Sequence, residues 1–101
     1  MRLTDHQIAV IKSTAREIWG AQVQVRLFGS RVDDSRRGGD IDLYVSGVTL
    51  PAEEQLQTKL RFLVRLKQLL GDQRIDVVFA PVEGEAALPI QRMAQATGVL
   101  L

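Results

Sequence analysis

The hydrophobic residues of the chain recur with two different periods, and the two periods alternate along the sequence. Between 8 and 19 the spacing is that of a helix with one apolar side, formed by Ile8, Ile11, Ala15, Ile18 and Trp19. Thr4 followed three residues later by Gln7 is typical of a capping box, so we expect this helix to begin after Thr4 and to end at Gly20. Over 22–28 the pattern changes to strict alternation, which predicts a strand with its apolar residues on one face.

The same two patterns continue to the end of the chain. Residues 40–46 and 74–80 alternate like strands, 51–70 carries a long apolar helical stripe, and 86–96 predicts a last short helix. We expect the leucines and the phenylalanine of the long helix to lie mostly in the core. Its apolar stripe is nevertheless wider than one sheet needs, which leaves a partner surface as the alternative, as does the apolar tail 99–101. The predicted fold class is α/β (α+β): one domain over 1–101, with helices on one face of a small mixed sheet and the other face open.

Composition removes several kinds of chemistry. The 101 residues include no cysteine, which excludes a disulfide framework, a thiolate metal site and a thiol nucleophile. His6 is the only histidine, so a histidine-rich metal site is excluded as well. Any reaction must therefore depend on carboxylates, hydroxyls, guanidinium groups or backbone amides.

Charge and hydropathy indicate which partners and which compartment the protein is expected to have. A net charge of +1 argues against a domain that coats nucleic acid, although ten of the 13 cations are arginine, which suits phosphate recognition. No apolar run approaches the roughly 20 residues of a membrane span, and the first residues lack the apolar core of a signal peptide. We expect a cytoplasmic domain.

Three aspartates are predicted to lie on one face of two strands. Asp40 and Asp42 are two residues apart and so project from the same face of their strand. If the strand 74–80 pairs beside it, Asp76 shares that face, because Ile75 and Val77 take the apolar side. Carboxylates that converge repel one another unless a cation joins them, and a set of hard oxygen ligands favours Mg²⁺ or Mn²⁺. The alternative is that these aspartates are solvated residues of a half-buried strand.

Gly29 and Ser30 follow the first predicted strand directly. A glycine permits close approach of a phosphate, the hydroxyl of Ser30 donates a hydrogen bond, and Arg31 adds a cation. Taken alone, the pair favours an ordinary strand-to-helix turn in which Ser30 is the cap.

Together these features resemble a known family. Phe28-Gly29-Ser30-Arg31, followed by Gly39-Asp40-Ile41-Asp42-Leu43 and by a third strand with Asp76, is similar to the signature of the nucleotidyltransferase superfamily that includes DNA polymerase beta. The order of elements fits the polymerase-beta-like fold over essentially the whole chain. The short length resembles the minimal nucleotidyltransferases, many of which are antitoxins paired with a small all-helical toxin of the HEPN class.

The resemblance implies a function and a role for each residue. Asp40, Asp42 and Asp76 would be the catalytic and metal-binding residues, holding Mg²⁺ (or Mn²⁺), and Asp76 would help to deprotonate an acceptor hydroxyl. Gly29, Ser30 and Arg31 would bind the nucleoside triphosphate. Such in-line displacement needs positioning and charge neutralisation rather than a protein nucleophile.

The resemblance also implies a substrate and a partner. ATP would donate AMP to a hydroxyl, in the first place a tyrosine of a cognate HEPN-type toxin in a hetero-oligomer. The alternative is a weakly catalytic or non-catalytic antitoxin that neutralises its partner by binding, for which Asp33 and Asp34 count, since two added negative charges near a triphosphate would weaken its binding. Antibiotic modification and template-directed polymerisation fit this short, nearly neutral chain less well.

Overall fold

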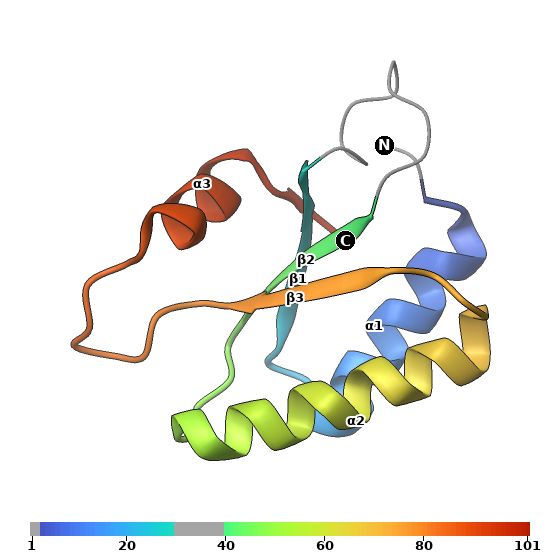
Figure 1. Cartoon of the computed structure of the whole chain (residues 1–101), viewed down its shortest axis with the longest axis horizontal. Coiled ribbons are helices and arrows are strands. Elements are labelled where there is room, and N and C mark those ends of the chain that lie inside the picture. Colours follow the sequence, from blue (N-terminus) through green and yellow to red (C-terminus); the bar gives the residue numbers. More distant parts are fainter. Residues whose placement is uncertain (1–2, 30–39) are drawn as a thin grey trace.

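The computed structural model describes residues 3–29 and 40–101, which form three helices and one four-stranded sheet. Figure 1 shows them in chain order. Their bounds are α1 (Asp5–Trp19), β1 (Gln24–Phe28), β2 (Ile41–Ser46), α2 (Ala52–Leu70), β3 (Ile75–Phe79), α3 (Pro89–Thr97) and β4 (Val99–Leu100). The small mixed α+β domain that the sequence predicts is thus confirmed, and element bounds differ from the expected ranges by a few residues.

The sheet has the strand order β3-β2-β1-β4. β2 pairs antiparallel with β1 and parallel with β3, so that the sheet is mixed. β4 pairs antiparallel with the outer edge of β1, and the Leu101 amide continues this pairing by donating to the Val25 carbonyl at 2.9 Å. The apolar tail 99–101, which the sequence offered as a partner surface, is thus paired with β1 as an edge strand.

The first helix begins as the sequence predicts. The Thr4 hydroxyl accepts a hydrogen bond from the Gln7 amide at 3.0 Å, and the Gln7 side chain accepts one from the Thr4 amide at 2.9 Å. This reciprocal pair satisfies two amides that have no partner inside the helix. It fixes the start of α1 and so the direction in which its apolar side meets the sheet.

The main core lies between the sheet and the pair α1 and α2. It is built by the inward residues of the three long strands together with Ile11, Ala15, Trp19, Phe62 and Leu66. The Trp19 ring packs on Phe62 with 4.8 Å between ring centroids, and its indole nitrogen donates to the Thr58 hydroxyl at 2.9 Å. These contacts fix the rotation of α2, since they require Phe62 and Leu66 to point inward.

The expectation that most apolar side chains of α2 lie in the core is wrong for four of them. Leu56, Leu60, Val64 and Leu69 remain 57%, 55%, 58% and 45% exposed. A helix that lies on one layer buries only one side, and that side is already occupied by Phe62 and Leu66.

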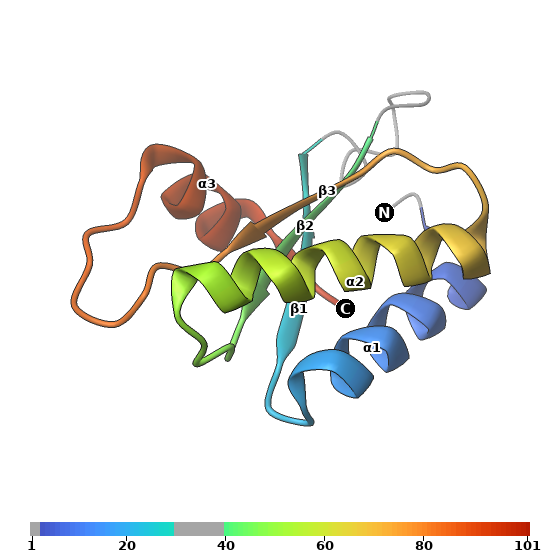
Figure 2. The same ribbon diagram turned by 60° about the horizontal axis from the view of Figure 1, so that its bottom comes forward.

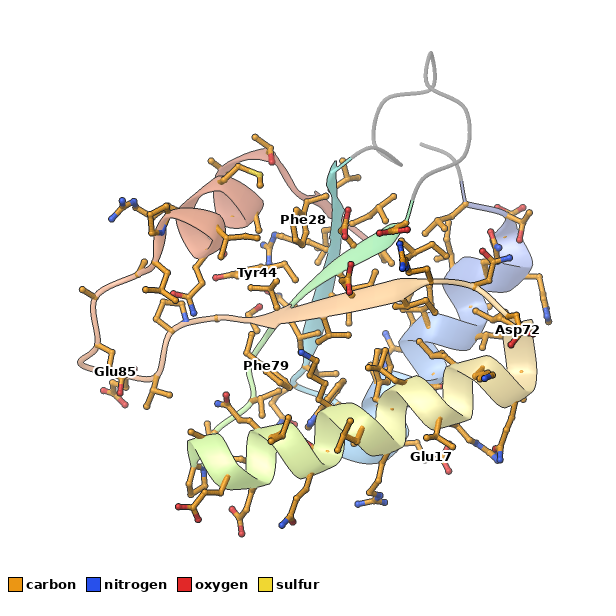
Figure 3. The ribbon with its side chains drawn as sticks, viewed as in Figure 1. Glu17, Phe28, Tyr44, Asp72, Phe79 and Glu85 are labelled. Atoms are coloured by element: carbon orange, nitrogen blue, oxygen red, sulfur yellow. The ribbon has the colours of Figure 1, made fainter. Side chains whose placement is uncertain are left out.

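The expectation that the second face of the sheet is open is also wrong in part. α3 lies across from α1 and α2, as Figures 1 and 2 show, and packs on β1 and β2 from the opposite side. Phe28, Tyr44 and Ala94 form a small second core there, in which each is at most 3% exposed. Figure 3 shows the Phe28 and Tyr44 side chains on the side of the sheet that α3 occupies. Only part of this face remains accessible, at the end of β2 and β3 that carries the aspartates.

Within the part of the chain that the structure describes, no helix is both long enough and apolar enough to cross a membrane.

Candidate functional site

Two of the three predicted aspartates face each other across neighbouring strands. In the parallel pair of β2 and β3, Asp42 is the register partner of Asp76. Register partners in adjacent strands lie about 5 Å apart and project to the same side. The predicted pairing of these strands, and the placement of both carboxylates on the face opposite the main core, are therefore confirmed.

Burial and repulsion make Asp42 a weaker acid than usual. Asp42 is half-buried, and this burial is the largest cause that raises its pKa above the ordinary value of 3.8. The negative charges of Asp76 and then Asp40 raise the pKa further. Because all three effects oppose the ionised form, a bound cation would be stabilising at this position.

Gly29 closes the same site from the end of β1. Its φ of +74° lies in the left-handed region, which side chains disfavour. A Cβ atom at this position would collide with the carboxylate oxygen Oδ2 of Asp42. Phe28, the preceding residue, is the register partner of Asp42 in the antiparallel pair. Glycine thus permits both the turn at the strand end and the observed position of the Asp42 carboxylate.

Asp40 lies just before β2 and takes a different partner. Its Oδ1 is 4.0 Å from Nε of Arg74, and the two side chains are 38% and 80% exposed. Within 3–29 and 40–101, no three histidine, aspartate or glutamate side chains come close enough to hold one metal ion together. The structure therefore brings Asp42 and Asp76 together as a pair, with Asp40 beside them and directed to Arg74.

A groove with a volume of about 460 Å³ runs past the carboxylate pair. Asp42, Asp76 and Gly29 line one part of it, and Ile90 and Met93 of α3 form an apolar wall. Lys59 of α2 also lines the groove. None of Ile90, Met93 and Lys59 was among the predicted site residues. Ile90 and Met93 are 47% and 44% exposed on a helix whose Ala94 is fully buried. Their apolar character is visible in the sequence, but their place in the groove follows only from the packing of α3 on this face of the sheet.

Two of the predicted triphosphate-binding residues, Ser30 and Arg31, lie outside the described residues, as do Asp33 and Asp34. Gly29 is the one member of that predicted set whose position is known.

No protein-family model and no curated protein sequence matches the chain. The function is therefore inferred from the chemistry of Asp42, Asp76 and Gly29 themselves. Two adjacent carboxylates at the end of a groove can hold a divalent cation, and one of them can accept a proton from a group bound beside it.

Proposed function

We propose that the chain is a metal-dependent nucleotidyltransferase of the minimal, polymerase-beta-like type, and that it transfers AMP from ATP to a hydroxyl group. The observation that carries this proposal is the register of Asp42 with Asp76, next to a glycine that ends β1. It places the two aspartates of different strands, and one glycine of the resembling motif, at one end of one groove.

Asp42 and Asp76 fit a divalent cation, although among the described residues no third carboxylate is directed toward the pair. Asp42 and Asp76 would hold it, because both offer hard oxygen ligands and because repulsion between them is relieved by positive charge. Asp40 would join them after giving up its long, exposed contact with Arg74. When bound, the metal supplies charge neutralisation for the triphosphate.

The remaining chemistry belongs to the side chains and the substrates. The acceptor oxygen forms a bond to the α-phosphorus of ATP, the bond from that phosphorus to the bridging oxygen breaks, and pyrophosphate leaves with the electron pair. Asp76, the more exposed carboxylate, accepts the proton of the acceptor hydroxyl. Gly29 leaves room beside Asp42, and the apolar wall of Ile90 and Met93 excludes water from one side of the groove.

The acceptor that we propose is a tyrosine of an all-helical toxin of the HEPN class, for which this chain would be the antitoxin. The test is to incubate the protein with ATP, Mg²⁺ and the protein encoded by the adjacent gene, and to measure the intact mass of that partner. We expect a gain of one AMP that is lost with Asp42→Asn and with Asp76→Asn. Asp72→Asn is the matched control, because this carboxylate is exposed and pairs with Lys67 instead, at 3.5 Å. An unchanged partner mass, or an equal gain with the Asp42 and Asp76 variants, would refute the proposal.

A second candidate function is a binding antitoxin that acts without catalysis. The observation in its favour is the uncovered apolar side of α2, which offers a contact surface away from the aspartates. The double variant Asp42→Asn/Asp76→Asn separates the two functions. If it forms the same complex and still silences the toxin, binding alone is sufficient.

A further inference from the structure

The outer side of α2 carries an apolar stripe that none of the described residues covers. Leu56, Leu60 and Val64 are spaced four residues apart and are each more than half exposed. Residues at this spacing are neighbours on a helix surface, so the three side chains form one strip of roughly 12 Å. A hollow with a volume of about 370 Å³ lies along it between Leu60, Val64 and Arg65.

The core of the domain does not explain this stripe. Phe62 and Leu66 are completely buried on the opposite side of the same helix, and Phe62 is in contact with Trp19. Polar side chains at 56, 60 and 64 would leave these contacts intact, since none of the three belongs to the core. The exposed apolar side chains therefore lower the solubility of the protein without stabilising its fold.

The charges beside the hollow are positive, whereas Glu53 and Glu54 lie in the first turn of α2 and Asp72 pairs with Lys67 at its other end. Between 55 and 70 the helix contains four cations and no aspartate or glutamate; the cations are Lys59, Arg61, Arg65 and Lys67. Arg61 and Arg65 line the hollow together with Leu60 and Val64. An occupant that buries the stripe is favoured if it brings negative charge to Arg61 and Arg65, because positive charge there would repel these two cations.

This charge pattern separates the three surfaces that could cover the stripe. A second copy of the chain would place the cations of one α2 against those of the other, which is unfavourable. A membrane surface with anionic lipids would accept leucines and cations, but its binding strength scales with the apolar area inserted, and here only three side chains are available, because Phe62 and Leu66 are buried in the core. A partner helix with an apolar seam and acidic margins satisfies both the apolar and the charged residues.

We propose that the stripe Leu56–Leu60–Val64 with its cationic margin is a docking site for an acidic amphipathic helix of another protein. The partner helix lies along α2, inserts apolar side chains into the hollow at Leu60 and Val64, and sets carboxylates against Arg61 and Arg65. The stripe lies on the outer side of α2, which packs on the face of the sheet opposite to Asp42 and Asp76, so docking at Arg61 and Arg65 does not depend on nucleotidyl transfer. Lys59 lines the groove of the carboxylate pair and is not part of the docking site.

The first part of the test uses two designed probes. One is a fluorescein-labelled amphipathic helical peptide of 22 residues with a leucine seam and glutamate margins; the other has lysine at every glutamate position. Fluorescence anisotropy should show binding of the acidic probe only, weakening as salt increases, and amide chemical shifts should change along α2. Equal binding of both probes, binding of neither, or shifts confined to another element would overturn the proposal.

The second part uses variants at exposed positions, where a substitution should not disturb folding. Leu60→Ser/Val64→Ser should weaken binding of the acidic probe at least tenfold while the circular dichroism spectrum and the Tm stay unchanged. Arg65→Glu should weaken it about tenfold, whereas Arg92→Glu on α3, with the same change in net charge, should not. Equal effects of Arg65→Glu and Arg92→Glu would reduce the interaction to net charge and overturn the docking site. Two other results would identify a different occupant and so overturn it too: self-association that Leu60→Ser/Val64→Ser abolishes, or binding to phosphatidylserine vesicles but not to the acidic probe.

Discussion

Asp42 and Asp76 stand opposite each other in neighbouring parallel strands, although 33 residues of intervening chain separate them. The crossover helix α2 brings β3 beside β2 in this register, while Phe62 and Leu66 attach the helix to the core. The acidic pair is therefore a consequence of how the core packs on the other face of the sheet.

Removal of one carboxylate should make the other a stronger acid. The pKa of Asp42 is raised first by burial and then by the charge of Asp76. We expect Asp76→Asn to lower the pKa of Asp42 while leaving it above 3.8, because burial remains. A carbon-13 NMR titration of the Asp42 carboxyl group measures this directly. Asp72→Asn, the control, should leave the titration unchanged, and an equal shift in both variants would show that the pair is not coupled.

The same raised pKa gives the stability a defined dependence on pH. A group whose pKa is higher in the folded state stabilises the fold in its protonated form. That stabilisation is complete below the ordinary value of 3.8 and is lost as the pH rises through the higher pKa of the folded state. At pH 7 the ionised Asp42 therefore opposes folding, and Asp42→Asn should be more stable than the parent chain. Since the carboxyl group is only half-buried, solvent screening keeps the gain small, about 0.5 kcal/mol or roughly 2–4 °C in Tm.

The measurement for this prediction is thermal unfolding of both proteins at a series of pH values. The difference between Asp42→Asn and the parent should shrink as the pH falls through the folded-state pKa of Asp42. A difference that is constant with pH would assign the effect to packing instead of ionisation.

Divalent metal should reverse the unfavourable charge of the pair. Addition of Mn²⁺ or Mg²⁺ at pH 7 to about ten times its dissociation constant should stabilise the chain by about 1.4 kcal/mol. For a domain of this size the corresponding rise in Tm is roughly 6 °C or more. Asp42→Asn and Asp76→Asn should abolish the rise, and Asp72→Asn should retain it. A rise of equal size in all four proteins would place the metal elsewhere.

The positions of the carboxylates were predictable because the alternation of β2 and β3 is unambiguous. Ile41, Leu43 and Val45 leave only one face for Asp42, and the same reasoning places Asp76. The exact register between the two strands was not predictable, because it depends on how α2 sits on the sheet.

The sequence was least informative where a pattern allows more than one solution. Leucines occur on several sides of α2, and only the tertiary contacts of Trp19 with Phe62 select the buried side.

The last strand could not be predicted either. β4 has two residues, too few for any period to be visible. Its pairing with β1 draws α3 onto the second face of the sheet, where Gly98 permits a close approach: a Cβ there would lie 3.0 Å from Cβ of Arg26. α3 covers part of the second face of the sheet because β4 pairs with β1, and the periodicity of hydrophobic residues does not predict such long-range pairing.

Gly29 should be indispensable for the position of Asp42 and not only for the turn. Gly29 and Gly84 both have a positive φ, +74° and +87°. A Cβ at Gly84 would have no neighbour within 4 Å, whereas one at Gly29 would collide with Oδ2 of Asp42. Gly84→Ala therefore carries backbone strain alone, about 1 kcal/mol, and Gly29→Ala should cost at least as much and in addition turn the Asp42 carboxylate away from its observed position. Chemical denaturation gives the two free energies of unfolding, and the Asp42 titration shows whether its pKa changes. If alanine is tolerated equally at the two positions and the pKa of Asp42 is unaltered in both, the contact between Gly29 and Asp42 has no part in shaping the site.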